Sequence, residues 1–140
     1  MSAEKYTLDT NVLVYSVDRQ AGDRHYKSIE LIERMTQCEC ILTLQALAEF
    51  YSAVTRKNKM PHKDAQDQAN DWMVLFPVVA ADPDTFQRAT QAVDQHPFSF
   101  WDSMLLETAV RAGVTHFISE DLQHGRFWKG MCIQNPYLEV

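Results

Sequence analysis

The sequence predicts an α/β domain built on a mainly parallel sheet. Short apolar segments alternate with longer segments whose apolar residues recur every three or four positions. Strands that alternate with helices of about 10–15 residues are typical of parallel sheets covered by helices. A chain of 140 residues suits one domain, which we expect to span residues 1–140.

The strands are expected where short apolar runs end at a polar residue or a proline. A buried strand of a parallel sheet is apolar on both faces, so its residues form a continuous run. The five expected strands are Tyr6–Leu8, Cys40–Thr43, Val78–Val79, His116–Ser119 and Met131–Gln134.

Helices are expected in the intervals between these strands. Amphipathic stripes, prolines at first helical positions and a following glycine mark their bodies and ends. The expected helices are Arg24–Gln37, Leu44–Thr55, Pro61–Leu75, a helix that begins at Asp82–Asp84, and Ser99–Ala112. A short basic turn, Arg56–Lys63, separates the second from the third.

Composition and charge narrow the class of protein. The net charge of −6 argues against a general nucleic-acid binder with a basic surface, although a carboxylate site that binds cations also makes a sequence acidic. Three irregularly spaced cysteines form no disulfide framework. Neither a membrane span nor the apolar core of a secretory signal is present, so we expect a cytoplasmic protein with no membrane partner.

Acidic residues gather where parallel sheets bind ligands. Asp9 directly follows the first strand, and Glu120–Asp121 follows the fourth. The carboxyl ends of parallel strands share one edge of the sheet, which is where α/β domains hold ligands. Glu49 and Asp102 lie in apolar helical surroundings, where a carboxylate is costly unless it is paired or binds something.

Taken alone, each acid has an ordinary structural explanation. Asp9 fits a turn, Asp102 fits the first turn of a helix, Glu49 fits a solvent-facing position, and Glu120–Asp121 fits a loop. Their joint placement instead predicts a cluster of carboxylates around a cation. Oxygen ligands without histidine or cysteine favour Mg²⁺ or Mn²⁺ over zinc.

Four segments in order resemble one family. They are Leu8–Asn11, Leu47–Phe50, Phe100–Ser103 and Ile118–Gly125. Over essentially its whole length the chain resembles the PIN-domain family, in particular the VapC-like ribonuclease toxins of toxin–antitoxin systems. The resemblance implies a three-layer α/β/α fold with a mainly parallel five-stranded sheet, and a single PIN domain.

The resemblance also implies an activity and a set of residues. The activity is a Mg²⁺- or Mn²⁺-dependent endoribonuclease whose products carry 5′-phosphate and 3′-hydroxyl ends. The expected catalytic and metal-binding residues are Asp9, Glu49, Asp102 and Asp121, with Asp121 favoured over its neighbour Glu120. Asn11 is expected to orient Asp9 or a bound water, and Thr10 and Ser119 are expected to hydrogen-bond to the acids.

Partners are inferred partly from charge and partly from the resemblance. Arg56, Lys57, Arg126 and Lys129 are candidate contacts to RNA. The alternative is a solvated turn for the first two, and a segment in which Phe127 and Trp128 cover the core for the others. The family implies a cognate antitoxin and a homodimer, for which the apolar faces of residues 24–37 and 44–55 are candidate surfaces.

Rival functions remain at this point. The first is a catalytically silent PIN-like module that binds RNA or a protein partner. An enzyme with an aspartyl nucleophile after the first strand is disfavoured, because Asn11 occupies the place of its second acid. Cleavage of DNA is separated from cleavage of RNA by the resemblance alone.

Overall fold

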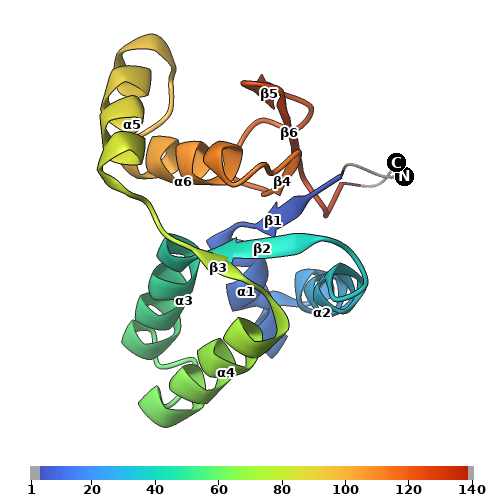
Figure 1. The fold of residues 1–140 in the computed structure, drawn as a ribbon. Helices are drawn as coiled ribbons and strands as arrows, with labels where there is room; N and C mark the ends of the chain where they lie inside the picture. Colours follow the sequence, from blue (N-terminus) through green and yellow to red (C-terminus); the bar gives the residue numbers. More distant parts are fainter. Residues whose placement is uncertain (1–3, 139–140) are drawn as a thin grey trace.

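The computed structural model describes residues 4–138 as a sheet with helices on both faces (Figure 1). Residues 1–3 and 139–140 of the predicted 1–140 domain lie outside the described part. The strands are β1 Tyr6–Leu8, β2 Cys40–Thr43, β3 Val78–Val79, β4 His116–Ile118, β5 Phe127–Trp128 and β6 Met131–Gln134. The helices are α1 Thr10–Val17, α2 Asp23–Met35, α3 Leu44–Arg56, α4 His62–Leu75, α5 Pro83–Gln95 and α6 Phe100–Arg111, with a short 3₁₀ turn at Arg19–Ala21.

The strand order explains where a ligand would bind. The sheet runs β3-β2-β1-β4-β6-β5, and every pair is parallel except the β5–β6 hairpin. The chain moves outward from β1 through β2 to β3 and then crosses to β4 on the other side of β1. This reversal places a topological switch point between β1 and β4, and switch points are where open α/β sheets bind ligands.

The same reversal divides the helices into two layers. Right-handed crossovers in opposite directions place their helices on opposite faces of a sheet. In Figure 1, α5 and α6 lie above β1 to β3, while α1 to α4 lie below these strands. The predicted three-layer α/β/α fold is therefore confirmed. The core joins side chains of the sheet and both layers, including Leu8, Val12, Phe50, Leu106, Phe117 and Ile133.

One strand and one α-helix of the structure were not predicted from the sequence. The sheet has six strands rather than five, because the two-residue β5 pairs with β6 and is too short to show a period. Residues 10–17 form α1, although their β-branched, apolar composition resembles that of a strand. Asp9 caps this helix, and its side chain accepts a hydrogen bond from the Thr10 N–H.

The two helix faces considered for a homodimer lie mostly in the core. On α2, Ile32 and Met35 are buried, whereas Tyr26 of the same stripe is 64% exposed. On α3, Phe50 and Val54 are buried, so the buried parts of both faces are unavailable to a second copy of the chain. Within residues 4–138, every helix is too short or too polar to cross a bilayer.

Candidate active site

A cavity of about 400 Å³ lies at the switch point of the sheet. Its walls come from four places: the start of α1, one side of α3, the first turns of α6, and the loop after β4. The residues that line it are Asp9, Thr10, Asn11, Glu49, Ser52, Ala53, Arg56, Asp102, Leu105 and Asp121. The structure thus brings all four predicted site acids to one cavity.

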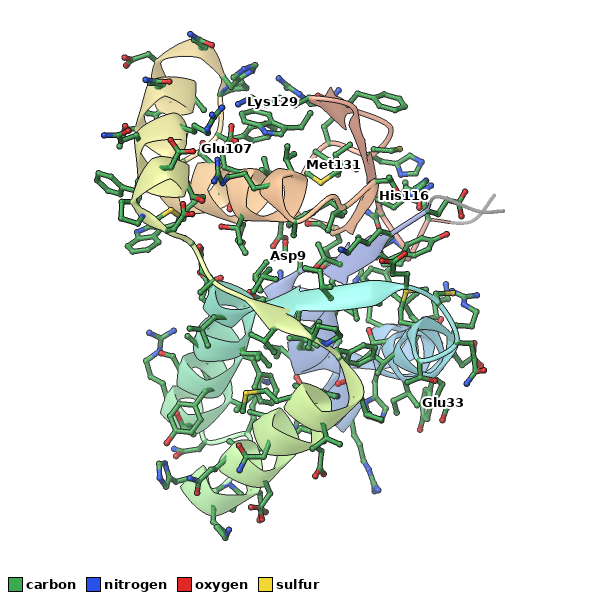
Figure 2. All side chains as sticks on the ribbon, viewed as in Figure 1. Asp9, Glu33, Glu107, His116, Lys129 and Met131 are labelled. Atoms are coloured by element: carbon green, nitrogen blue, oxygen red, sulfur yellow. The ribbon has the colours of Figure 1, made fainter. Side chains whose placement is uncertain are left out.

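Asp9 is the most deeply buried of these acids, and it lies near the middle of the molecule where β1 ends (Figure 2). One carboxylate oxygen accepts the Thr10 N–H at 2.7 Å, and the other accepts the Ser119 hydroxyl at 2.7 Å. Its own N–H donates to the Ile118 carbonyl at 2.9 Å, which ties the end of β1 to the end of β4. Both oxygens are therefore held in fixed positions.

Asp121 is oriented by Ser119 and by Asn11, although Asn11 was expected to orient Asp9 or a bound water. The Asn11 side-chain amide donates to its carboxylate at 2.6 Å, and its N–H donates to the Ser119 hydroxyl at 3.1 Å. Ser119 therefore connects Asp9 and Asp121, because the same hydroxyl accepts from one and donates to the other. Ser119 and Asn11 both lie at the acid cluster, but Asn11 hydrogen-bonds to Asp121 and not to Asp9.

Glu49 and Asp102 are held by helices on opposite sides of the sheet. The Thr10 hydroxyl donates to the Glu49 carboxylate at 2.9 Å, so α1 fixes the acid of α3. Asp102 lies in the first turn of α6, where its N–H donates to the Ser99 hydroxyl at 3.1 Å. Each of these two acids therefore enters the cavity from a helix that a hydrogen bond fixes close to the acid.

The neighbouring acids Glu120 and Asp121 have different surroundings. Glu120 accepts hydrogen bonds from the Tyr15 hydroxyl and, at 2.8 Å, from Arg24 Nε. Asp121 lines the cavity, and Glu120 does not. This geometry agrees with the preference for Asp121 as the fourth acid of the site.

The cavity concentrates negative charge that the chain does not neutralise. Burial, with repulsion from Asp121 and Asp102, raises the pKa of Asp9 to about 6. Burial, together with Glu120 and Asp102, also raises the pKa of Asp121. None of the ion pairs formed within residues 4–138 includes Asp9, Glu49, Asp102 or Asp121.

The donor set fits a hard divalent cation. Throughout residues 4–138, no three His, Cys, Asp or Glu side chains lie close enough to share an ion as they stand. The four acids therefore form an open carboxylate wall rather than a closed cage. An open wall suits Mg²⁺, which keeps several of its waters and needs only one or two carboxylates from the protein. The absence of histidine and thiolate from the cavity disfavours zinc.

Only one of the four predicted RNA contacts lies at the cavity. Arg56 lines it, but Lys57, Arg126 and Lys129 do not. Lys129 pairs with the buried Glu107 of α6, and Arg126 places its guanidinium 4.7 Å from the centre of the Phe98 ring. The structure therefore gives both side chains local packing partners.

Three lining residues were not predicted from the sequence: Ser52, Ala53 and Leu105. Ser52 could have been found, because it lies three residues after Glu49 and four before Arg56 on the same helix. A residue three or four positions from a known site residue on the same helix is therefore expected to line the site as well. Leu105 lies three residues after Asp102 and follows the same rule.

A family model for the PIN domain matches residues 6–127. The chain belongs to the PIN domain family. The match includes all four site acids, and the resemblance seen in the sequence is confirmed. No curated protein matches the sequence.

Solved PIN domains of toxin–antitoxin systems share this fold. VapC20 of Mycobacterium tuberculosis, described as a sarcin-ricin loop cleaving toxin, has a TM-score of 0.62 and 18% identity over 81% of this chain and 87% of that one. DNA-bound VapBC from Salmonella typhimurium has a TM-score of 0.68 and 15% identity over 95% and 98%. A toxin–antitoxin complex from Klebsiella pneumoniae has a TM-score of 0.68 and 16% identity over 95% and 98%. Identities this low show a common fold.

Proposed function

We propose that this PIN domain is a metal-dependent endoribonuclease that hydrolyses RNA phosphodiester bonds, and that it is the toxin of a toxin–antitoxin pair. One observation carries the proposal: four carboxylates from separate elements line one cavity and none has a cationic partner within residues 4–138. Such a cluster is electrostatically unfavourable on its own and becomes favourable around a cation. The family and the structural neighbours support the same activity.

The residues that would hold the ion are Asp9, Asp102, Asp121 and Glu49. Bound Mg²⁺ or Mn²⁺ supplies positive charge that stabilises negative charge developing on phosphate oxygens and lowers the pKa of a bound water. Asp9 and Asp121 are the best positioned ligands, because Ser119, Thr10 and Asn11 fix their oxygens. This rigidity reduces the reorganisation needed when the ion binds.

The remaining groups of the cavity orient the substrate and accept a proton. The Arg56 guanidinium binds a backbone phosphate by charge-assisted hydrogen bonds. Either Glu49 or Asp102 takes the proton of the attacking water, since one carboxylate of the four can act as a general base while the other three hold the ion. Water then attacks the phosphorus, and the 3′ oxygen leaves with a proton, which gives 5′-phosphate and 3′-hydroxyl ends.

The proposed partners are RNA, a cognate antitoxin and a second copy of the chain. An acidic cavity attracts a basic segment, and an antitoxin that inserts such a segment would occupy the ion and phosphate positions together. Size measurement of the purified protein tests the homodimer. We further propose a cytoplasmic location, where an RNA substrate would be met.

The test is cleavage of a mixed RNA pool by purified protein, free of antitoxin, with Mg²⁺ or Mn²⁺. Cutting should occur, stop with EDTA, and be lost in Asp102→Asn. Asp67→Asn is the matched control, because Asp67 is an exposed acid of α4 away from the cavity. A 2′,3′-cyclic phosphate product would contradict the mechanism, since it requires attack by the RNA itself.

The same assay separates the alternative function. A folded protein that binds Mn²⁺ and RNA but cuts nothing would be the catalytically silent module. A protein that neither cuts RNA nor binds Mn²⁺ would show that the acids have another role.

A further inference from the structure

Trp101 is the exposed tryptophan next to the cavity. Its side chain is 60% exposed, whereas Trp72 and Trp128 are 4% and 2% exposed. It directly precedes Asp102, so the backbone of α6 places the ring beside a site acid. Its carbonyl accepts a hydrogen bond from the Gln45 side chain at 3.0 Å, which ties this turn to the start of α3. The backbone position of Trp101 is therefore defined by two helices.

A second hollow, of about 320 Å³, lies against this ring. It is lined by Gln45, Ala48, Glu49, Ser52 and Trp101. Glu49 and Ser52 also line the acid cavity, so the two hollows share a wall. Glu49 is the only charged residue among those that line the second hollow. The hollow therefore suits a flat, uncharged group joined to whatever occupies the cavity.

The two hollows follow one stripe of α3. Gln45, Glu49, Ser52 and Arg56 recur at spacings of four, three and four, which is one face of a helix. The stripe is about 16 Å long at 1.5 Å per residue. Arg56, which suits a phosphate, lies at one end, and the wall of the second hollow, beside Gln45 and Trp101, lies at the other. A single strand of nucleic acid has the same alternation of charged phosphates and flat bases.

We propose that Trp101 stacks on the base of a nucleotide next to the scissile phosphate and is a positioning residue for RNA. The inference rests on the proposed function and adds a subsite to it. Aromatic rings bind successive bases of single strands in this way, with little dependence on base identity. Gln45 and Ser52 offer hydrogen bonds at the edge of that base. The stack keeps the flanking nucleotide in place while the acids act on the phosphate.

Tryptophan fluorescence tests the stack without cleavage. Trp72 and Trp128 are buried, so RNA that stacks in the second hollow should quench the emission of Trp101 alone. The probe is a short random-sequence RNA pool, titrated with Mg²⁺ into an Asp121→Asn background. Quenching should be clear in this protein and absent when Trp101→Phe is added. No quenching, or quenching that persists with Trp101→Phe, overturns the inference.

Cleavage of modified RNA tests the role in positioning. Trp101→Ala should slow cutting about tenfold, the expected loss of one stacked base, and Trp101→Phe should restore most of it. Tyr26→Ala is the matched control, because Tyr26 is 64% exposed on α2. Removing the base beside the cut should slow the wild type similarly but add little to Trp101→Ala, since both changes delete the same contact.

The outcomes separate this inference from the proposed function. Wild-type cutting that Trp101→Ala leaves unchanged overturns the stack, keeps the nuclease, and would leave the hollow to a protein partner. A wild type that cuts nothing refutes the proposed function, and the fluorescence titration then decides the inference alone. Melting temperatures close to wild type for Trp101→Ala confirm that the effect is not loss of folding.

Discussion

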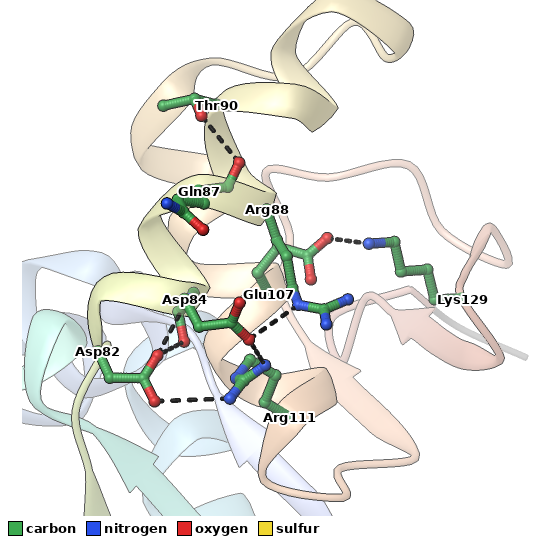
Figure 3. Close-up of polar contacts among 9 residues, drawn as sticks. Asp82, Asp84, Gln87, Arg88, Thr90, Glu107, Arg111 and Lys129 are labelled. Carbon is green, nitrogen blue, oxygen red and sulfur yellow. Dashed lines mark hydrogen bonds and ion pairs between the residues drawn. The ribbon is translucent and has the colours of Figure 1, made fainter.

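Two groups of carboxylates in this protein have opposite surroundings: one group pairs with cationic side chains, and the other does not. Around α5 and α6, Asp82 and Asp84 pair with Arg111, Asp84 also pairs with Arg88, and Glu107 pairs with Lys129 (Figure 3). At the switch point of the sheet, Asp9, Glu49, Asp102 and Asp121 form no ion pair within residues 4–138.

The difference distinguishes acids that stabilise the fold by pairing with cationic side chains from acids that lack such a pair and that we propose bind a cation. Glu107 is 1% exposed and would be very unfavourable as an unpaired charge, so Lys129 reaches it from the β5–β6 turn. The buried structural acid Glu107 is therefore paired with a cationic side chain, Lys129. The cavity acids form no ion pair within residues 4–138, although Arg56 lines the same cavity, and this favours an ion from solution.

The largest expected effect separates two adjacent acids. Asp121→Asn should lower cleavage about 1,000-fold, because it removes a carboxylate that holds the ion. Glu120→Gln should keep most of the activity, since Glu120 is bound to Arg24 and Tyr15 outside the cavity. Initial rates on one RNA substrate make the comparison. Equal losses in the two variants would contradict the assignment.

Breaking an ion pair of the first group should lower stability and leave activity unchanged. Lys129→Met should lower the free energy of unfolding by about 3 kcal/mol, because it leaves Glu107 charged and buried without its partner. Adding Glu107→Gln should recover most of this loss, and the folded variants should cut RNA normally. Urea denaturation measures the energies. A Lys129→Met variant that is stable but inactive would instead support Lys129 as an RNA contact.

Removing the charge of Asp9 should raise stability, whereas removing the charge of Lys129 should lower it. Its pKa, raised to about 6, means that the folded protein binds the proton more tightly than the unfolded chain. The wild type should therefore lose stability as the pH rises from about 4 to 6. Asp9→Asn should be more stable by about 3 kcal/mol well above pH 6 in EDTA, equal to the wild type near pH 4, and inactive. A variant less stable at both pH values would contradict the account.

The smallest effect is expected from the exposed pairs of α5 and α6. Arg111→Gln should lower the melting temperature only slightly, because exposed ion pairs contribute little and are screened by salt. The difference from wild type should disappear in high salt, and cleavage should be unaffected. Thermal melts at two salt concentrations check this. A large loss that persists in salt would mean that this network, like Glu107 and Lys129, is structural.

Most of the fold and the site was predictable because both follow local rules. Asp9 and Asp121 were found because parallel strands share an edge, and Glu49 and Asp102 because acids are unexpected among apolar neighbours. Helix capping and amphipathic spacing placed both ends of four helices, and the start of α5, within about two residues of the observed positions.

What the sequence did not predict depends on contacts between distant residues. The resemblance favoured Asp121 over Glu120, but the physical reason lies in the contact of Glu120 with Tyr15 of α1, a helix that no periodic pattern revealed. The basic and aromatic segment near Lys129 resembled an RNA contact until Glu107, distant in sequence, was seen to lie beside it. Propensity and spacing carry no information about such pairs.

The most direct test of the central claim is Mn²⁺ binding, measured by calorimetry on metal-free wild type, Asp102→Asn, Asp121→Asn and the Asp67→Asn control. The account predicts binding by wild type and control, and a loss of affinity of at least about tenfold in both cavity variants. Mn²⁺ affinity that is equal in all four proteins would show that the unpaired acids do not hold the ion.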